Sequence, residues 1–277
     1  MQPFVPKQLM QEELVTIVMT TFNSGRYLSE SIEAILKQTY PHWELLITDD
    51  CSTDSATLDT LARYEALDKR IKVFHFDTNK GPGAARNNSI EQAQGQFIAF
   101  CDSDDRWLPT KLEKQVAFMH DKDAAITFAP YYTCRYDGTV NGYVDAPAIL
   151  TLKDLKHDNK IGCLTAMYDV RKYGKFFMPT IRKRQDWALF LTILKQCGVA
   201  YALNEPLAIY RKTPGSVSRR KMPLLKYNAQ IYCLVFGYSK FKAYLYLFFI
   251  FLPTYFAKVI RNRLMSHAMA HKEVPAI

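Results

Sequence analysis

Short apolar runs alternate with helical patterns over the first 130 residues. Runs rich in β-branched and aromatic residues predict strands at 14–20, 43–48, 71–76, 96–101 and 124–128. After the first run, Leu28, Ile32 and Ile35 recur at helical spacing, and Ser24 is the expected cap of this helix. Further helices are predicted at 53–67, 83–93 and 109–120. This alternation predicts an α/β fold with a mixed, mostly parallel sheet covered by helices on both faces.

The pattern is less regular in the second half of the chain. Residues 131–160 look irregular, and the segments predicted after them are a strand at 161–167, a helix at 186–196 and a strand at 200–210. Neither an internal repeat nor a low-complexity linker divides the sequence. We therefore predict a single domain over 1–220, with halves at 14–130 and 131–220, followed by a helical tail at 221–277.

Polar residues follow each of the first four predicted strands. These segments are Thr20 to Asn23, Asp49 to Asp50, Asn79 to Arg86 and Asp102 to Asp105. Ligands of parallel α/β sheets bind at the carboxyl ends of the strands. The four segments therefore predict one shared crevice.

The last of these segments, FCDSDDRW at 100–107, carries three carboxylates in four positions. Like charges this close disfavour one another's ionisation, so a cation is expected among Asp102, Asp104 and Asp105. Mg²⁺ or Mn²⁺ suits oxygen ligands and is usually completed by substrate phosphate and water. Turn or helix-entry chemistry is the alternative, because Asp stabilises turns and caps helices.

Composition excludes several classes of protein. With 48% hydrophobic residues the chain can bury a large core, and its six cysteines are too scattered for a zinc site or a disulfide framework. The first residues lack a secretory signal, so we expect a cytoplasmic protein. Gly81 to Arg86 contains Pro82 and follows the third strand, which argues against a dinucleotide loop. Arg86 can still receive phosphate charge at a helix start, although a plain helix start is the alternative.

Positive charge is concentrated at the end of the chain. Residues 205–277 hold 12 basic and 2 acidic residues, against 24 basic and 25 acidic in the remainder. The same region contains the uncharged run AYLYLFFIFLPTYFA between Lys242 and Lys258. This run is too short to span a bilayer and predicts an interfacial amphipathic segment on an anionic membrane surface. A core helix packed on the domain is the alternative.

Three segments combine motifs: IVMTTFNSGRYLSESIEAILKQTYPHWELLITDDCSTD, NKGPGAARNNSIEQAQGQFIAFCDSDDRWLPTKLEKQ and RQDW. This combination resembles glycosyltransferases of family 2, which have the GT-A fold, and is most similar to bacterial enzymes that build O-antigen, capsule or teichuronic acid. The resemblance implies a nucleotide-sugar-binding half at 14–130 and an acceptor half at 131–220. It implies transfer from a UDP-sugar to a lipid-linked saccharide, lipopolysaccharide or capsule acceptor, by a peripheral enzyme on the inner face of the cytoplasmic membrane.

The resemblance also implies roles for single residues on the donor side. Thr20, Phe22 and Asp50 would hold the nucleotide, with Asp50 accepting a hydrogen bond from the uracil. Asp102 and Asp104 would form the metal-binding pair, with Asp102 towards the ribose and Asp104 on a Mn²⁺ or Mg²⁺ ion. A strand-end hydroxyl for Thr20 and a core position for Phe22 are the structural alternatives.

On the acceptor side, the resemblance implies that Asp186 in RQDW is the general base of an inverting displacement. An N-cap of the following helix is the alternative role for Asp186. The segment YRKTPGSVSRR resembles a loop in which Arg211, or Ser216 to Arg219, closes over the diphosphate. A solvated basic loop is the alternative for this segment.

Two other classes of function remain open. A nucleotidyltransferase would use similar metal carboxylates, but it would be expected to carry a Gly-rich basic loop where this chain has TTFNSGRY. A non-catalytic module would bind membrane or nucleic acid through the basic tail. That module would leave the four convergent strand ends unexplained, so we expect no nucleic-acid partner.

Overall fold

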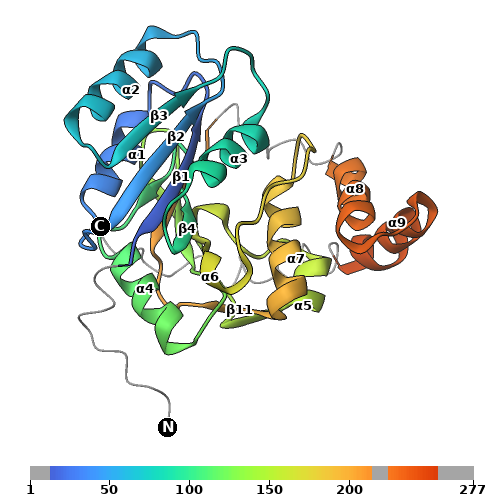
Figure 1. The fold of residues 1–277 in the computed structure, drawn as a ribbon. Helices are drawn as coiled ribbons and strands as arrows, with labels where there is room; N and C mark the ends of the chain where they lie inside the picture. The colour runs from blue at the N-terminus through green and yellow to red at the C-terminus, as the bar shows by residue number, and fades with distance from the viewer. Residues whose placement is uncertain (1–12, 214–223, 255–277) are drawn as a thin grey trace.

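The computed structural model describes residues 13–213 and 224–254. Within these residues, an eight-stranded sheet has the order β3-β2-β1-β4-β10-β6-β11-β9 and carries helices on both faces (Figure 1). Its strands are β1 (Val15–Thr21), β2 (Trp43–Asp49), β3 (Ile71–His75), β4 (Phe97–Phe100), β6 (Ile126–Phe128), β9 (Ile149–Thr151), β10 (Met167–Asp169) and β11 (Val199–Ala202). Only β9 and β10 run against the other strands of this sheet, so the predicted mixed, mostly parallel sheet is confirmed.

A second sheet of the described residues has the order β5-β12-β7-β8. Its strands are β5 (Arg106–Trp107), β7 (Tyr131–Cys134), β8 (Val140–Val144) and β12 (Ala208–Arg211). Because β5 follows the acidic segment 102–105 directly, this small sheet fixes one side of the predicted crevice to the second half of the chain.

The helices cover the central sheet in two layers. They are α1 (Leu28–Leu36), α2 (Ser55–Leu67), α3 (Pro82–Gln92), α4 (Lys111–Asp121), α5 (Leu152–His157), α6 (Val170–Tyr173), α7 (Gln185–Cys197), α8 (Leu224–Phe236) and α9 (Lys240–Tyr246). Ile17 and Met19 of β1 pack in the core under α1, α2 and α4, whereas Val18 points into the core under α3 and α7. Alternate residues thus fill opposite cores, which is why a strand covered on both faces is mostly apolar.

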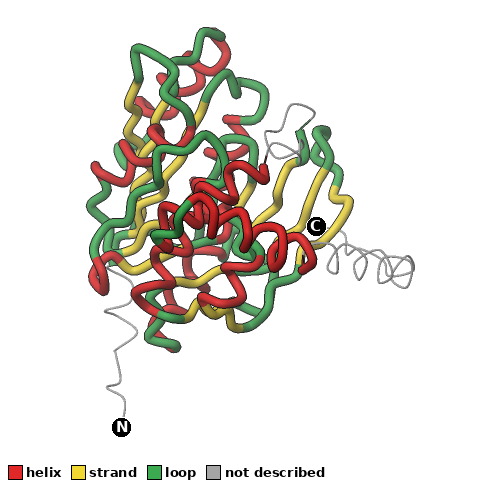
Figure 2. The backbone as a smooth tube through the Cα atoms, turned by 90° about the vertical axis from the view of Figure 1, so that its right-hand side faces the viewer, coloured by secondary structure: helices red, strands yellow, loops and turns green. Residues whose placement is uncertain are grey.

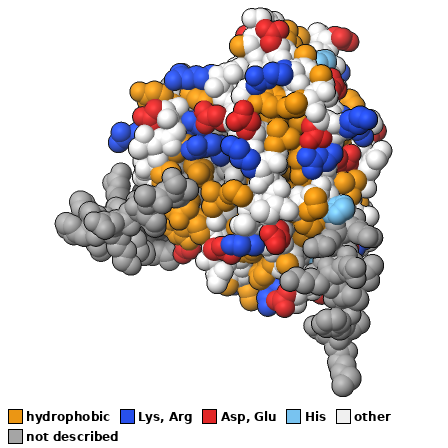
Figure 3. Space-filling view, turned by 90° about the vertical axis from the view of Figure 1, so that its left-hand side faces the viewer, with side chains coloured by type: hydrophobic (Ala, Val, Ile, Leu, Met, Phe, Trp, Pro, Cys, Tyr) orange, Lys and Arg blue, Asp and Glu red, His pale blue; other side chains and the backbone are white. Residues whose placement is uncertain are grey.

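Charges of both signs lie close together on the face formed by α1, α2 and α4. Figure 3 shows this face, which is the left-hand side of Figure 1, with Lys and Arg interspersed with Asp and Glu. Such a mixed distribution gives no single-sign field over this face.

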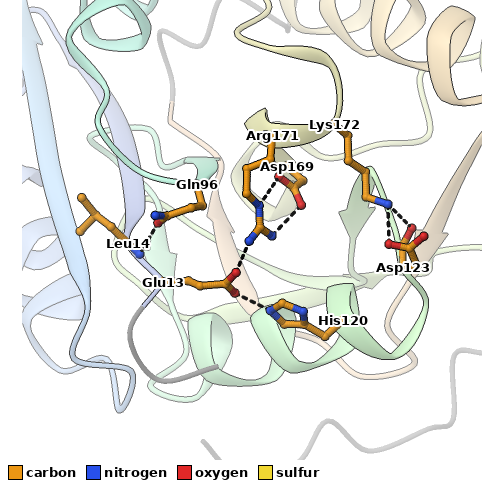
Figure 4. A network of polar contacts seen from close by, with 8 residues as sticks. All are labelled: Glu13, Leu14, Gln96, His120, Asp123, Asp169, Arg171 and Lys172. Carbon is orange, nitrogen blue, oxygen red and sulfur yellow. Dashed lines mark hydrogen bonds and ion pairs between the residues drawn. The ribbon is translucent and has the colours of Figure 1, made fainter. Parts of the chain in front are cut away.

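A polar network ties the amino end of β1 to α4 and α6 (Figure 4). Glu13 contacts both His120 and Arg171, and Arg171 also pairs with Asp169 at 2.8 Å. Lys172 pairs with Asp123 at 2.6 Å beside this group. The network lies at the amino ends of the parallel strands and therefore braces the edge of the sheet opposite the predicted crevice.

Several sequence predictions of single elements were wrong. Ser24 does not cap α1, because the N-cap is Tyr27 and the Ser24 hydroxyl donates to the Phe22 carbonyl at 3.2 Å. The predicted strand 161–167 is a 3₁₀ turn at Cys163–Thr165 followed by β10. The predicted strand 200–210 is two strands, β11 and β12, in different sheets. Residues 131–160 are not irregular, since they form β7, β8, β9 and α5.

The tail forms helices in its described part and packs on the domain. Figure 2, viewed from the side of α8 and α9, shows helices in front of the strands. After α9 the chain continues through a π-helical turn at Leu247–Phe251. No single described helix is long and apolar enough to cross a membrane, although Leu225–Phe236 and Lys240–Thr254 reach that composition as a pair bent by 119°.

Candidate active site

The first side of the site is a contact between the acidic loop and α3. Arg86 lies in the second turn of α3 and donates from Nη2 to Oδ1 of Asp102 at 2.5 Å. Its side chain is 11% exposed, whereas that of Asp102 is 31% exposed. Burial lowers the pKa of the Arg86 guanidinium, but the surrounding negative charge, chiefly that of Asp102, raises it further above its usual value. Arg86 is therefore a permanent cation beside the first carboxylate of the loop.

Asp104 and Asp105 crowd the same loop with negative charge. Burial, and then the charge of Asp102, raise the pKa of Asp104 to about 6. Burial and the charges of both neighbours also raise the pKa of Asp105 well above its ordinary value. Asp105 accepts a hydrogen bond from the backbone N–H of Arg211 at 2.9 Å, and α4 begins only at Lys111, so Asp105 is not a helix-entry residue.

Asp186 approaches this loop from the second half of the chain. It lies in the first turn of α7, whose N-cap is Arg184 in a left-handed conformation with φ 64°, so Asp186 is not the N-cap. The Asn159 side chain donates to Oδ2 of Asp186 at 3.0 Å. Asp186 also contributes to the raised pKa of Arg86, after the larger contribution of Asp102. The Arg86 guanidinium therefore interacts electrostatically with both carboxylates.

The starts of α3 and α7 touch each other, which explains this convergence. A Cβ atom added to Gly83 would lie 2.6 Å from Nε2 of Gln185. Any other residue at this position would therefore clash with Gln185. Burial raises the pKa of the Cys163 thiol well above its ordinary value, Arg86 lowers it in part, and Asp102 and Asp186 raise it further. The structure therefore brings together Arg86, Asp102 and Asp186.

The residues predicted to hold the nucleotide lie at neighbouring strand ends. Thr20 lies near the end of β1, opposite Thr48 of β2. Phe22 follows β1 and is 47% exposed, so the core alternative for Phe22 was wrong. Asp50 is buried, and its two carboxylate oxygens accept hydrogen bonds from the backbone N–H groups of Lys80 at 2.7 Å and Gly81 at 2.8 Å. The uracil contact of Asp50 stays a prediction.

Arg211 occupies a different position from the one that its sequence segment suggested. It lies in β12 with a side chain only 2% exposed, and its guanidinium stacks over the Tyr27 ring at 4.6 Å. It donates to the backbone oxygens of Asp104 at 3.1 Å and Tyr136 at 3.2 Å, and to Oε2 of Glu30 at 2.5 Å. This places Arg211 behind the acidic loop rather than on a closing segment. Ser216 to Arg219 lie outside the described residues.

Sequence reasoning missed Asn159 of this site and a buried lysine, Lys111, at the start of α4. Asn159 falls in a stretch without a recognisable pattern, and nothing in the sequence linked it to Asp186. Lys111 is fully buried, donates to Oε1 of Gln115 at 2.8 Å and lies 3.8 Å from the centre of the Trp107 ring. Burial lowers its pKa to about 7. Its position two residues after a Pro resembled an ordinary exposed helix start.

The acidic loop suits a metal ion only in combination with a substrate. No group of three or more His, Cys, Asp or Glu side chains within 13–213 and 224–254 is arranged to hold a metal ion by itself. Mg²⁺ and Mn²⁺ sites in phosphate-transfer enzymes commonly use one or two carboxylates and take the other ligands from phosphate and water. The crowded pair Asp102 and Asp104 fits such a site, because a cation would relieve the repulsion that raises the pKa of Asp104.

Comparisons with known proteins show which family the chain resembles. A family model described as glycosyl transferase family 2 matches residues 16–179. The chain is 42% identical over 220 residues to the putative teichuronic acid biosynthesis glycosyltransferase TuaG of Bacillus subtilis, covering 79% of this chain and 87% of the relative. It is 36% identical over 219 residues to the Escherichia coli UDP-Glc:alpha-D-GlcNAc-diphosphoundecaprenol beta-1,3-glucosyltransferase WfgD, covering 78% of this chain and 84% of the relative.

Solved structures share the fold at lower sequence identity. The complex of S. aureus TarS residues 1–349 with UDP-GlcNAc matches with a TM-score of 0.63 and 21% identity, covering 83% of this chain and 69% of that chain. The complex of the same TarS fragment with UDP matches with a TM-score of 0.62. Because the family model covers more than half of the chain and two relatives exceed 30% identity over most of their length, the chain belongs to glycosyl transferase family 2.

Proposed function

We propose that this glycosyltransferase moves a sugar from a UDP-sugar to a lipid-linked saccharide, or to a lipopolysaccharide or capsule acceptor, with inversion and with a divalent metal ion. One observation carries the proposal. Arg86 of α3 pairs with Asp102 of the acidic loop at 2.5 Å, and the start of α3 at Gly83 touches Gln185, the residue before Asp186 in α7. This arrangement supports a site in which a candidate metal-binding carboxylate and a candidate base act on one donor.

On the donor side, the fold shared with TarS in its UDP and UDP-GlcNAc complexes supports a uridine nucleotide. Thr20, Phe22 and Asp50 would bind the nucleoside from the ends of β1 and β2. Asp102 and Asp104 would hold Mn²⁺ or Mg²⁺, and the bound ion would stabilise negative charge on the departing diphosphate. Arg86 would add a fixed positive charge on the α3 side.

On the acceptor side, Asp186 would accept the proton of the attacking hydroxyl. Asn159 donates to one of its oxygens, which fixes the carboxylate and leaves the other oxygen available for the acceptor. A single displacement by a hydroxyl on the face opposite the leaving group inverts the anomeric centre. The name of WfgD specifies an undecaprenol-linked acceptor, and this supports a lipid-linked acceptor here as well.

The test is a panel of nucleotide-sugars incubated with the full chain, with Mn²⁺ or Mg²⁺, and with synthetic acceptors that carry a short diphosphate-linked lipid. We expect one UDP-sugar to release UDP only with metal present, and the product to show the opposite anomeric configuration by NMR. Release of a sugar 1-phosphate instead of UDP, from attack at the α-phosphorus, would identify a nucleotidyltransferase and refute the proposal. Retention of configuration would refute the role of Asp186 as the base of a single displacement.

A further inference from the structure

The segment from α9 through the π-helical turn has two faces of different character. Ala243, Leu247 and Phe251 point inwards and belong to the main hydrophobic core. Six apolar side chains with exposed fractions between 40% and 76% point outwards: Phe241, Tyr244, Leu245, Phe248, Phe249 and Ile250. Scattered single apolar residues are normal on a surface, but six within ten positions form a patch of the kind that marks an interaction site.

Contacts of the inward face hold this patch in place. The Phe251 ring lies 5.9 Å from that of Trp187, and the Tyr246 ring lies 4.7 Å from that of Tyr232 in α8. Lys156 of α5 donates to the Tyr238 hydroxyl at 2.7 Å and lies 4.4 Å from the centre of the Tyr246 ring. The outward residues therefore cannot turn into the core, since the inward residues already occupy it.

The charge around the patch is of one sign. Lys240 and Lys242 flank its start, and the sequence from 206 to 272 contains 12 basic residues and no acidic one. A second copy of the chain would bring like charges together at this patch. An anionic bilayer offers the complementary charge, and its headgroup region accepts aromatic side chains.

We propose that the exposed apolar face of α9 and of the π-helical turn after it, defined by these six residues, docks the enzyme on an anionic lipid bilayer. This inference rests on the proposed function for its biological sense, because a lipid-linked acceptor lies in a membrane. Trp187 follows the candidate base Asp186 directly and contacts Phe251, so docking also fixes the orientation of α7 relative to the membrane surface.

The test compares full-length variants in sedimentation with vesicles of phosphatidylcholine alone or with added phosphatidylglycerol. The variant F241S/F248S/F249S removes three of the most exposed rings, and L67S/I149S/Y173S is the matched control on other exposed apolar positions. We expect the α9 variant to lose at least roughly 100-fold in partition coefficient and the control to bind as the wild type does. K240Q/K242Q should weaken binding roughly 5-fold for each lysine on anionic vesicles only.

Other measurements separate the competing explanations. Thermal unfolding must be unchanged in the α9 variant, and transfer to a water-soluble acceptor must stay at the wild-type level. The inference is overturned if wild-type protein stays in the supernatant with anionic vesicles. Analytical ultracentrifugation then distinguishes two other occupants of the patch: a second copy of the chain, if the protein is a dimer, or residues 255–277, if it is a monomer. Failure of the proposed function gives a different result: wild-type protein binds the vesicles but transfers no sugar.

Discussion

Replacing Arg211 by methionine tests whether this side chain organises the acidic loop. The guanidinium donates to the backbone oxygens of Asp104 and Tyr136, and the methionine would leave both oxygens without this donor. A hydrogen bond from a charged donor contributes about 1.5–3 kcal/mol. The contact with Glu30 is discounted because the Glu30 side chain is 48% exposed to water.

The two carbonyl contacts, reduced by the desolvation cost of the buried guanidinium, give an expected loss of about 3 kcal/mol in the free energy of unfolding. This corresponds to a fall of roughly 6–12 °C in the melting temperature of a chain of this size. Chemical denaturation with a linear extrapolation measures the loss. Arg211→Lys is the control, because lysine keeps the charge but lacks the planar fork that reaches both oxygens.

The same two variants are expected to shift the pH dependence of activity by different amounts. Burial and Asp102 raise the pKa of Asp104 to about 6, and Arg211 and Arg86 lower it in part. Loss of the positive charge in R211M raises the pKa of Asp104 further, so the acidic limb of the kcat/KM profile moves to higher pH. R211K keeps the charge and moves the limb less. If R211M instead leaves both stability and the pH profile unchanged and raises only the KM for the donor, Arg211 contacts the diphosphate and the positioning argument is refuted.

Four further substitutions separate binding, catalysis and packing. Asp104→Asn should abolish the metal dependence of donor binding in calorimetry, and unchanged metal dependence would contradict its role as a ligand. Asp186→Asn should keep donor affinity while turnover falls by at least roughly 100-fold, because a base acts on the acceptor; loss of donor binding would argue for a structural role. Phe251→Ala should lower the free energy of unfolding by about 3–5 kcal/mol, whereas Phe249→Ala, on the exposed face, should change it by less than about 0.5 kcal/mol. Equal effects in denaturation would contradict the description of two faces in the segment from α9 through the π-helical turn.

The first half of the fold could be predicted because its signals are local. Each strand from β1 to β4 is a short run rich in β-branched and aromatic residues, and a helix long enough to show its own period lies between each of them and the next strand of the central sheet. The second half depends on contacts that no local pattern records. β10 is three residues long and inserts antiparallel between β4 and β6. The run 200–210 leaves one sheet and enters the other between β11 and β12, and its apolar residues do not mark where the change occurs.

The site was predictable to the extent that its residues follow strand ends or match family motifs. Asp102, Asp104 and Asp50 meet that condition, and Asp186 was found through the RQDW motif. Arg211 donates a hydrogen bond to Asp105, which is 106 residues away in the sequence, and Asn159 donates one to Asp186, which is 27 residues away. Only the three-dimensional fold makes Arg211 a support of the acidic loop, since an Arg after a strand in a basic segment is equally compatible with a solvated loop.

The tail shows why composition alone left two alternatives for one segment. In an ordinary amphipathic helix, polar residues mark the exposed face, but AYLYLFFIFLPTYFA has apolar residues on every side. The structure assigns Leu247 and Phe251 to the core and leaves Phe248 and Phe249 exposed, so a core role and a surface role coexist in one helix. Truncation before Phe241 would therefore remove core and surface together, and loss of membrane binding in such a protein would have no single meaning. Substitutions confined to one face are the experiment that can distinguish the two roles.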